Sequence, residues 1–382
     1  MKKTTLLAPG PTPVPPDTLL AMARPIIHHR EPEFKPVFSA CREGLRYLYQ
    51  TERDVVILAA SGTGAMEAAV TNFLRKGDKA LYVNGGKFGE RWGKILKAYG
   101  CRGVELKVEW GSAVDPEDVR RALDADPAIR AVYVQASETS TAVEHPVGAL
   151  AAITRDRPDV LLVVDGITAV GVFALPMDAT GIDVLVTGSQ KALMLPPGLA
   201  FIAWSEKAEA FLGTSDLPRF YFDLQAERKK QQESQTAWTP AVSLVVGLAD
   251  VLRQIREETL EGVFSRTARL ADATRAAALA LGLELYAPDS PSDACTAVKM
   301  PPAVDGQALK KALRERFGIT VAGGQDQAKG KIIRIAHLGY ADTFDVVTAV
   351  SALEMALLGL GHPVELGTGV RAALQVLGGD AR

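Results

Sequence analysis

The segment Val184-Leu-Val-Thr-Gly-Ser-Gln-Lys-Ala-Leu-Met-Leu-Pro-Pro-Gly198 carries one lysine, Lys191, shortly after four apolar or β-prone residues. Residues 184–187 predict a core strand, the following Gly-Ser-Gln predicts a turn, and Pro-Pro-Gly breaks the chain. Lysine is rarely buried, and a desolvated ammonium loses its proton more readily, as an imine-forming amine must. The alternative is a lysine whose stem lies on the rim of the sheet and whose amine reaches solvent. This segment by itself leaves both interpretations open.

Strand-like segments alternate with helical patterns along the chain before residue 205. Six more strand candidates are residues 55–60, 80–84, 103–108, 131–135, 161–165 and 200–204. Most of the gaps between them have helical periodicity, as at residues 116–123. With residues 184–187, this alternation predicts an α/β fold with a large, mainly parallel sheet of the seven-stranded type and crossover helices. In such a fold a site lies at the carboxyl ends of the strands.

Polar side chains follow several of these strand candidates. Ser61-Gly-Thr-Gly-Ala-Met-Glu67 leads from a strand into a helical pattern, which turns backbone N–H groups, two hydroxyls and a helix dipole toward an anion such as phosphate. The turn lacks the lysine of a nucleotide P-loop and also suits an ordinary strand-to-helix connection. Thr139, Asp165 and Lys191 follow other strands, and Phe88 follows a Gly-Gly turn. Their convergence on one edge of the sheet predicts a binding crevice.

Composition limits the class of partner. Lys and Arg number 43 against 45 Asp and Glu, so the charge balance gives no reason to expect nucleic acid or an anionic membrane surface. We expect a small-molecule partner instead. No apolar segment reaches the roughly 18 residues of a membrane span, and the first residues run into Pro-Gly-Pro without a signal-peptide core, so we expect a cytoplasmic protein. Three widely spaced cysteines indicate neither a disulfide framework nor a zinc or other metal cluster.

The length of 382 residues predicts two domains. Residues 1–16 are expected to be an extended, proline-rich arm on the surface. Residues 17–257 are expected to form the large domain, and residues 258–382 a smaller C-terminal α+β domain. Within the large domain, the polar residues 228–240 predict a loop before a long helix.

Two further groups of residues have both a structural and a functional interpretation. Arg334 interrupts an apolar, mostly β-branched run, so it is either at the edge of a strand or a buried functional arginine. His28, His29 and Arg30 either line a site or belong to a solvated loop beside Pro32.

A phosphate turn, a carboxylate at a strand end and an imine-capable lysine are together what pyridoxal phosphate requires. On these features, and on the segments Val164-Asp-Gly-Ile-Thr168 and Gly181-Ile-Asp-Val184 leading into the lysine segment, the sequence resembles the class V, fold-type I aminotransferases. The resemblance covers nearly the whole chain and is strongest to the alanine-glyoxylate, serine-pyruvate and serine-glyoxylate aminotransferase branch. It implies a transaminase that uses pyridoxal 5'-phosphate and forms a homodimer with active sites shared between subunits.

Position by position, the resemblance implies a role for each candidate residue. Lys191 would bind the cofactor as an imine, Asp165 would pair with its pyridine nitrogen, and Arg334 would hold the substrate α-carboxylate with its planar fork. The other implied cofactor-binding residues are Thr63, Gly64 and Ala65 with Gln190 at the phosphate, Phe88 on the ring, Thr139 near the ring hydroxyl, Thr236 near the phosphate and Thr239 at the phosphate of the other subunit. Phe88 stands where some members have tryptophan, and Thr236 where others have tyrosine, so cofactor affinity and substrate range are in question.

The implied reaction moves an amino group from a small amino acid, alanine or serine, to a 2-oxo acid, glyoxylate or pyruvate, with ping-pong kinetics. Small donors are favoured because no second arginine is evident for a side-chain carboxylate, although Arg30 and the adjacent histidines could add polarity from the partner subunit. One alternative is a non-catalytic partner subunit, since some family members are labelled hydrogenase small subunits; the intact Lys191, Asp165 and Arg334 argue against it. A cysteine desulfurase or lyase is the other. Against it, Cys295 lies in an apolar strand pattern, and glutamine, not the histidine of a desulfurase, precedes the lysine.

Overall fold

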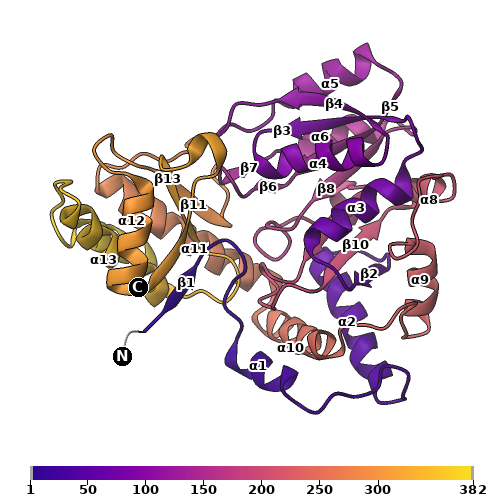
Figure 1. Ribbon diagram of the computed structural model, residues 1–382, viewed down its shortest axis with the longest axis horizontal. Helices are drawn as coiled ribbons and strands as arrows, with labels where there is room; N and C mark the ends of the chain where they lie inside the picture. Colours follow the sequence, from indigo (N-terminus) through magenta and orange to yellow (C-terminus); the bar gives the residue numbers. More distant parts are fainter. Residues whose placement is uncertain (1–2, 380–382) are drawn as a thin grey trace.

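The structure, a computed structural model, describes residues 3–379 and contains one large and one small β-sheet (Figure 1). All seven predicted strands of the large sheet are present, with ends that differ by at most two residues. In spatial order they are β2 (Val55–Leu58), β10 (Ala200–Trp204), β9 (Val184–Gly188), β8 (Leu161–Asp165), β5 (Ile129–Gln135), β3 (Lys79–Asn84) and β4 (Arg102–Lys107). The predicted α/β class and the mainly parallel sheet are confirmed.

Two hydrophobic cores lie on the two faces of this sheet, because successive residues of a strand point to opposite sides. In β8, Leu162 and Val164 belong to one core, and Leu161 and Val163 to the other. The first core is covered by α2 (Phe34–Tyr49), α5 (Pro116–Ala125), α6 (Val147–Arg155), α7 (Met177–Thr180) and α10 (Val242–Glu258). The second core is covered by α3 (Gly62–Phe73), α4 (Lys87–Ala98) and α8 (Glu206–Leu212). A strand that is buried on both faces must be apolar throughout, as β8 and β9 are.

Only β10 runs antiparallel to its neighbours in the large sheet, so the remaining strands all end at the same edge. After that edge come the N-terminus of α3, the turn before α4, the short hairpin of β6 (Ser137–Glu138) and β7 (Val143–Glu144), Asp165 itself, and the turn after β9. The predicted crevice is therefore built from the ends of five strands, β2, β9, β8, β5 and β3.

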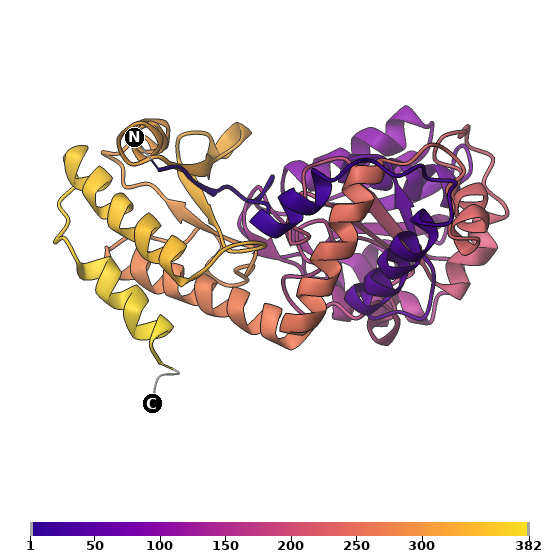
Figure 2. The same cartoon turned by 90° about the horizontal axis from the view of Figure 1, so that it is seen from below.

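The small sheet has the order β1-β12-β13-β11 and packs with helices into a separate core. Its strands are β1 (Thr5–Leu7), β12 (Ile319–Gly323), β13 (Ile332–Ala336) and β11 (Cys295–Lys299), and its helical elements are α11 (Leu260–Ala280), α12 (Gly306–Ala312), the π-helical turn Leu313–Phe317, the 3-10 turn Asp326–Ala328, α13 (Thr343–Gly359) and α14 (Thr368–Leu377). In Figure 2, α11 follows α10 at the lower edge of the view and connects the part of the chain around the large sheet to the part around the small sheet. Thr259, with φ of 68°, separates the two helices. Within residues 3–379, no helix is both long and apolar enough to cross a membrane.

The N-terminal arm differs from the expected surface strap. Its residues 5–7 form β1, which pairs in parallel with β12, and Leu7 and Thr12 are buried. The arm then crosses to the large sheet, as the indigo segment in Figures 1 and 2 shows, and its last residue, Pro16, already begins α1 (Pro16–Met22). Proline is well tolerated at the first position of a helix because the N–H it lacks would be unpaired there. Residues 1 and 2 of the predicted arm, and 380–382 of the predicted small domain, lie outside the described residues.

The loop predicted over residues 228–240 is also partly wrong. Residues up to 232 belong to α9 (Leu224–Gln232), whose start is capped by the Asp223 side chain. The helix is polar because it is anchored through hydrogen bonds: Gln231 donates to the carbonyl oxygen of Ile57 at 2.7 Å and accepts from its N–H at 2.9 Å. This pairing satisfies the backbone N–H and carbonyl of Ile57 on the outer edge of β2 with a side chain instead of a neighbouring strand.

Candidate active site

Lys191 lies in the turn after β9 and is 9% exposed, so the buried interpretation of the lysine segment is correct. The N-terminal arm holds it in place. Thr12 donates its hydroxyl to the Lys191 carbonyl at 2.8 Å and its N–H to the carbonyl of the preceding residue at 3.2 Å, and the Lys191 amine donates to the carbonyl of Pro9. Burial lowers the pKa of Lys191 to about 8, although the charges of Cys295 and Asp165 oppose this shift. About a tenth of the amine is therefore neutral and nucleophilic at about pH 7, far more than for an exposed lysine.

Asp165 ends β8 and is 4% exposed, so its carboxylate lies inside the crevice. Its Oδ1 accepts a 2.9 Å hydrogen bond from the N–H of Ile167. Burial, together with the neighbouring charge of Glu138, raises the pKa of Asp165 to about 7, against the opposing effect of Arg91 and Lys191. A buried carboxylate at this position needs a cationic or hydrogen-bonding partner, and a protonated ring nitrogen is such a partner.

Arg334 lies on β13, between β12 and β11, and is 6% exposed, so it is not at the edge of the sheet. Its guanidinium connects the two sheets' regions. Nε and Nη2 donate to the carbonyl of Gly323 at 3.2 and 2.8 Å, and Nη1 donates to the carbonyl of Thr139 at 2.6 Å. A guanidinium has five N–H groups, so one N–H remains on each terminal nitrogen. That pair matches the two oxygens of a carboxylate.

A buried glutamate, Glu138, joins the start of α4, which carries Phe88, to the β6–β7 hairpin, which carries Thr139. Its carboxylate accepts hydrogen bonds from the N–H groups of Phe88 at 3.0 Å and Gly89 at 2.9 Å, and from both the N–H and the hydroxyl of Ser140. A side chain at Gly86 would place its Cβ 2.4 Å from the Glu138 carboxyl carbon, so glycine is required there. Four donors on one fully buried carboxylate fix the positions of two predicted cofactor-binding residues at once.

Thr139 has its hydroxyl 2.6 Å from that of Thr168. The Thr168 hydroxyl donates to the carbonyl of Ser137 at 3.1 Å, so the Thr139 hydroxyl is the donor within the pair. The lone pairs of the Thr139 oxygen remain available to a ligand hydroxyl.

The predicted phosphate turn forms the N-terminus of α3. Ser61 is the N-cap residue, but no side chain caps this helix, so its first N–H groups lack the usual side-chain acceptor. The backbone is close-packed there: a Cβ on Gly62 would lie 2.6 Å from Ile167, and one on Gly64 would lie 2.6 Å from Ala60. Ala65 is fully buried beneath the turn. An anion is the natural acceptor for such a helix end.

Gln190 lies beside this helix end. Its Oε1 atom is buried without a hydrogen-bond partner among the described residues. A Cβ on Gly188 would lie 3.0 Å from that atom and 3.2 Å from the N–H nitrogen of Gly62, which places the Gln190 amide next to the turn. An amide left without a partner inside a protein is an exception that calls for a ligand.

Thr236 and Thr239 are not brought to Lys191 within this chain. The Thr236 hydroxyl donates to the carbonyl of Trp238 in its own loop, and Thr239 is exposed. Arg30 lies near the same loop, with Nη1 at 3.4 Å from the Gln235 side-chain oxygen, and the rings of His28 and His29 stand 4.8 Å apart beside it. The predicted roles of these residues at another subunit stay predictions.

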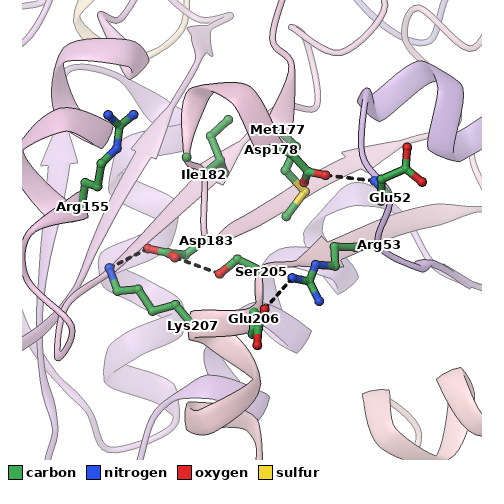
Figure 3. Close-up of a pocket in the computed structure, with 11 residues that line it drawn as sticks. Glu52, Arg53, Arg155, Met177, Asp178, Ile182, Asp183, Ser205, Glu206 and Lys207 are labelled. Carbon is green, nitrogen blue, oxygen red and sulfur yellow. Dashed lines mark hydrogen bonds and ion pairs between the residues drawn. The ribbon is translucent and has the colours of Figure 1, made fainter.

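The pocket drawn in Figure 3 lies at the opposite edge of the large sheet, at the start of β9. Four of its charged side chains form two ion pairs. Lys207 lies 3.1 Å from Asp183, which also accepts from the Ser205 hydroxyl at 2.8 Å, and Arg53 lies 3.0 Å from Glu206. These pairings give the pocket a structural explanation and separate it from the crevice around Lys191.

Two residues of the crevice escaped the sequence interpretation. Glu138 stands next to Thr139 in a segment already singled out, and a carboxylate at a strand end was the available signal. Arg91 follows Phe88 by three residues, one helical turn along α4, and that spacing was the signal for it.

The comparisons with known proteins agree with this geometry. Residues 9–348 match the family model described as aminotransferase class-V. The chain belongs to the class V aminotransferases. This family consists of enzymes that depend on pyridoxal phosphate, so the predicted enzyme class is correct.

Among curated relatives, the chain is 44% identical over 379 residues to the small subunit of a soluble hydrogenase from Synechococcus, covering 98% of both chains. It is 36% identical to the serine–glyoxylate aminotransferase of Methylorubrum extorquens, covering 97% of this chain and 95% of the relative. It is 35% identical to the L-aspartate–glyoxylate aminotransferase of Paracoccus denitrificans, covering 96% and 94%.

Solved structures extend the same similarity. The ureidoglycine-glyoxylate aminotransferase of Bacillus subtilis has a TM-score of 0.94 at 29% identity, covering 99% of this chain and 98% of its own. An alanine–glyoxylate aminotransferase from Nostoc has a TM-score of 0.89 at 28% identity, covering 94% and 96%. The expected resemblance to the glyoxylate aminotransferase branch is thereby confirmed.

Cys295, the residue relevant to the desulfurase alternative, lies in β11 and is fully buried. Burial raises the pKa of the Cys295 thiol to about 11, even though Arg334 and Lys191 act in the opposite direction. A thiol that must attack or carry sulfur needs to be accessible and ionised. Cys295 is neither, which disfavours the desulfurase alternative on structural grounds.

Proposed function

We propose that this protein is a transaminase that moves an amino group from a small amino acid, alanine or serine, to a 2-oxo acid, glyoxylate or pyruvate, by a ping-pong mechanism. The observation that carries this proposal is the buried amine of Lys191, whose pKa lies near 8, beside the buried carboxylate of Asp165. The names of the relatives support glyoxylate as an acceptor.

The residues at the crevice fit pyridoxal phosphate. The uncapped start of α3 and the N–H groups of the Gln190 amide beside it can donate to the phosphate, and Thr63, Gly64 and Ala65 supply the turn itself. Asp165 would hold the ring nitrogen, Thr139 the ring hydroxyl, and Phe88 the face of the ring. When bound, the cofactor supplies an aldehyde that condenses with amines and a ring that accepts electrons from the substrate.

The protein's own groups then perform three tasks. The two free N–H groups of Arg334 bind the substrate α-carboxylate and orient its α-carbon. The Lys191 Nζ takes the proton from that carbon in the first half-reaction and gives a proton to the α-carbon of the product amino acid in the second, which its lowered pKa permits near neutral pH. Lys191, Asp165 and Arg334 are all buried, which limits the access of competing water to these groups.

The structure supports the choice of a small donor through what surrounds Arg334. Arg334 is hydrogen-bonded to the hairpin residue Thr139, whereas the second arginine of the crevice, Arg91, contacts Thr63 and Phe88, and Arg30 is hydrogen-bonded to Gln235. In a homodimer, Thr236 and Thr239 would reach the other subunit's phosphate, and Arg30 with His28 and His29 would lie near the same loop. A donor carboxylate beyond the α-carboxylate would then depend on the partner.

The test is a donor panel on purified protein with bound pyridoxal phosphate. Alanine, serine, aspartate and glutamate are each added alone, and the loss of the yellow absorbance is followed; glyoxylate or pyruvate is then added to restore it. We expect alanine or serine to remove the colour fastest and glyoxylate or pyruvate to restore it.

Lys191→Ala is the companion variant, and it should show no yellow absorbance with added cofactor. Faster bleaching by aspartate than by alanine and serine would contradict the small-donor assignment. Bleaching by none of the four, with no spectral difference between wild type and Lys191→Ala, would contradict the transaminase itself.

A further inference from the structure

Arg91 on α4 lies between the phosphate turn and the Phe88 ring. Its Nη1 donates a 3.0 Å hydrogen bond to the hydroxyl of Thr63, the second residue of α3. Its guanidinium carbon stands 4.8 Å from the centroid of the Phe88 ring, within the range of a cation–π contact. One side chain thus contacts two residues that the proposed function assigns to different parts of the cofactor.

The positive charge of Arg91 has only uncharged contacts at these two positions. The neighbouring cations of the same helix are different, because Lys87 and Lys94 both pair with Glu90, at 2.5 and 3.1 Å. Glu90 is thereby engaged on the outer side of α4, and the guanidinium of Arg91 is directed to the start of α3 instead.

The phosphate turn otherwise offers uncharged donors. Backbone N–H groups, the Thr63 hydroxyl and the Gln190 amide can donate hydrogen bonds to an anion, but none of them carries a full positive charge. A phosphate monoester has a charge of about −1.5 to −2 near neutral pH. A guanidinium is the side chain best matched to such a group, since it pairs two N–H groups with two phosphate oxygens.

We propose that Arg91 binds the cofactor phosphate through its positively charged guanidinium. Its stacking on Phe88 also fixes the position of this ring-binding residue relative to the phosphate turn. This inference rests on the proposed function, because it presumes pyridoxal phosphate in the crevice. The position of Arg91 in the crevice is supported further by its positive charge, which lowers the pKa values of both Asp165 and Lys191.

The test compares two probes that differ only in the phosphate: pyridoxal phosphate and pyridoxal. Each is titrated into cofactor-free protein, and the Kd is taken from the yellow absorbance and from quenching of tryptophan fluorescence. Arg91→Met should raise the Kd for pyridoxal phosphate at least about tenfold, as expected for loss of a charge-assisted hydrogen bond, and should change the Kd for pyridoxal by less than about threefold. Arg91→Lys, which retains the charge but not the fork, should fall between wild type and Arg91→Met.

Lys94→Met is the matched control, because it removes a cation from the same helix at a site that is 65% exposed. It should leave both Kd values unchanged. An equal rise in the Kd values for pyridoxal and pyridoxal phosphate in Arg91→Met would overturn the proposal, since Arg91 would then act only through Phe88 or the fold. Unchanged Kd values for both probes would overturn it as well. If wild-type protein bound neither probe, the proposed function itself would fail, and this result is distinct from the other two.

Discussion

Replacing Asp165 by asparagine should stabilise the cofactor-free protein, and the gain should grow as the pH rises from about 5 to about 8. Burial raises the pKa of Asp165 from 3.8 to about 7. Between these two values the folded protein binds more protons than the unfolded chain, so wild-type stability falls as the pH rises through that window. The difference of 7 − 3.8 = 3.2 pKa units, at about 1.36 kcal/mol per unit, sets an upper limit of about 4 kcal/mol.

Asparagine does not titrate, and its side-chain oxygen can still accept the Ile167 N–H. The assay is the Tm of cofactor-free wild type and variant at about pH 5, 6, 7 and 8, with Asp289→Asn as an exposed control. The variant should already have the higher Tm at about pH 5, and the difference should roughly double by about pH 7 and then level off. Saturating pyridoxal phosphate should reverse the order, because Asp165 then gains a cationic partner. A Tm difference that stays constant over the whole pH range would refute the reasoning.

Two more outcomes are expected from the residues that hold Lys191 and the substrate. A Cβ at Gly10, where φ is 121°, would lie 2.4 Å from the Lys191 Nζ, so Gly10→Ala should slow the appearance of yellow absorbance with pyridoxal phosphate at least about tenfold. Gly77→Ala is the control, because Gly77 has a φ of 85° and open space around it. Equal slowing in both variants would contradict the steric argument. Arg334→Lys should raise the KM for the amino donor at least about tenfold and change the Kd for pyridoxal phosphate less than about threefold, whereas equal losses would remove Arg334 from the substrate role.

The seven strands of the large sheet could be predicted from the sequence because both faces of the sheet are covered. A run such as Leu161-Leu-Val-Val164 is apolar throughout and too short for a typical helix, so a strand buried on both faces is the favoured interpretation. The order of the strands could not be predicted, since the antiparallel insertion of β10 between β2 and β9 depends on pairing between residues far apart in the chain. The same reason hid α9, whose polar sequence is stabilised by the contact between Gln231 and Ile57, 174 residues away.

The candidate site divides in the same way. Lys191, Asp165 and Arg334 were identifiable because each is a charged residue within an apolar run, and such residues are rare unless they have a function. The arm at Pro9 and Thr12 was expected on the surface because prolines are typical of exposed, extended chain. Its burial against Lys191 follows from tertiary contacts that no local pattern encodes.

The small sheet and the arm that follows β1 supply hydrogen-bond acceptors for both Arg334 and Lys191. β1 pairs with β12, and the Gly323 carbonyl at the end of β12 accepts two hydrogen bonds from Arg334. Two residues beyond β1, the Pro9 carbonyl accepts the hydrogen bond from the Lys191 amine. The group proposed to bind the substrate carboxylate and the group proposed to move its proton are therefore held by the two neighbouring strands of one pair. A shift of β1 along β12 would move the Pro9 carbonyl relative to the Gly323 carbonyl, so the register of this pair places an acceptor for Lys191 relative to an acceptor for Arg334. The arm is therefore a part of the candidate active site.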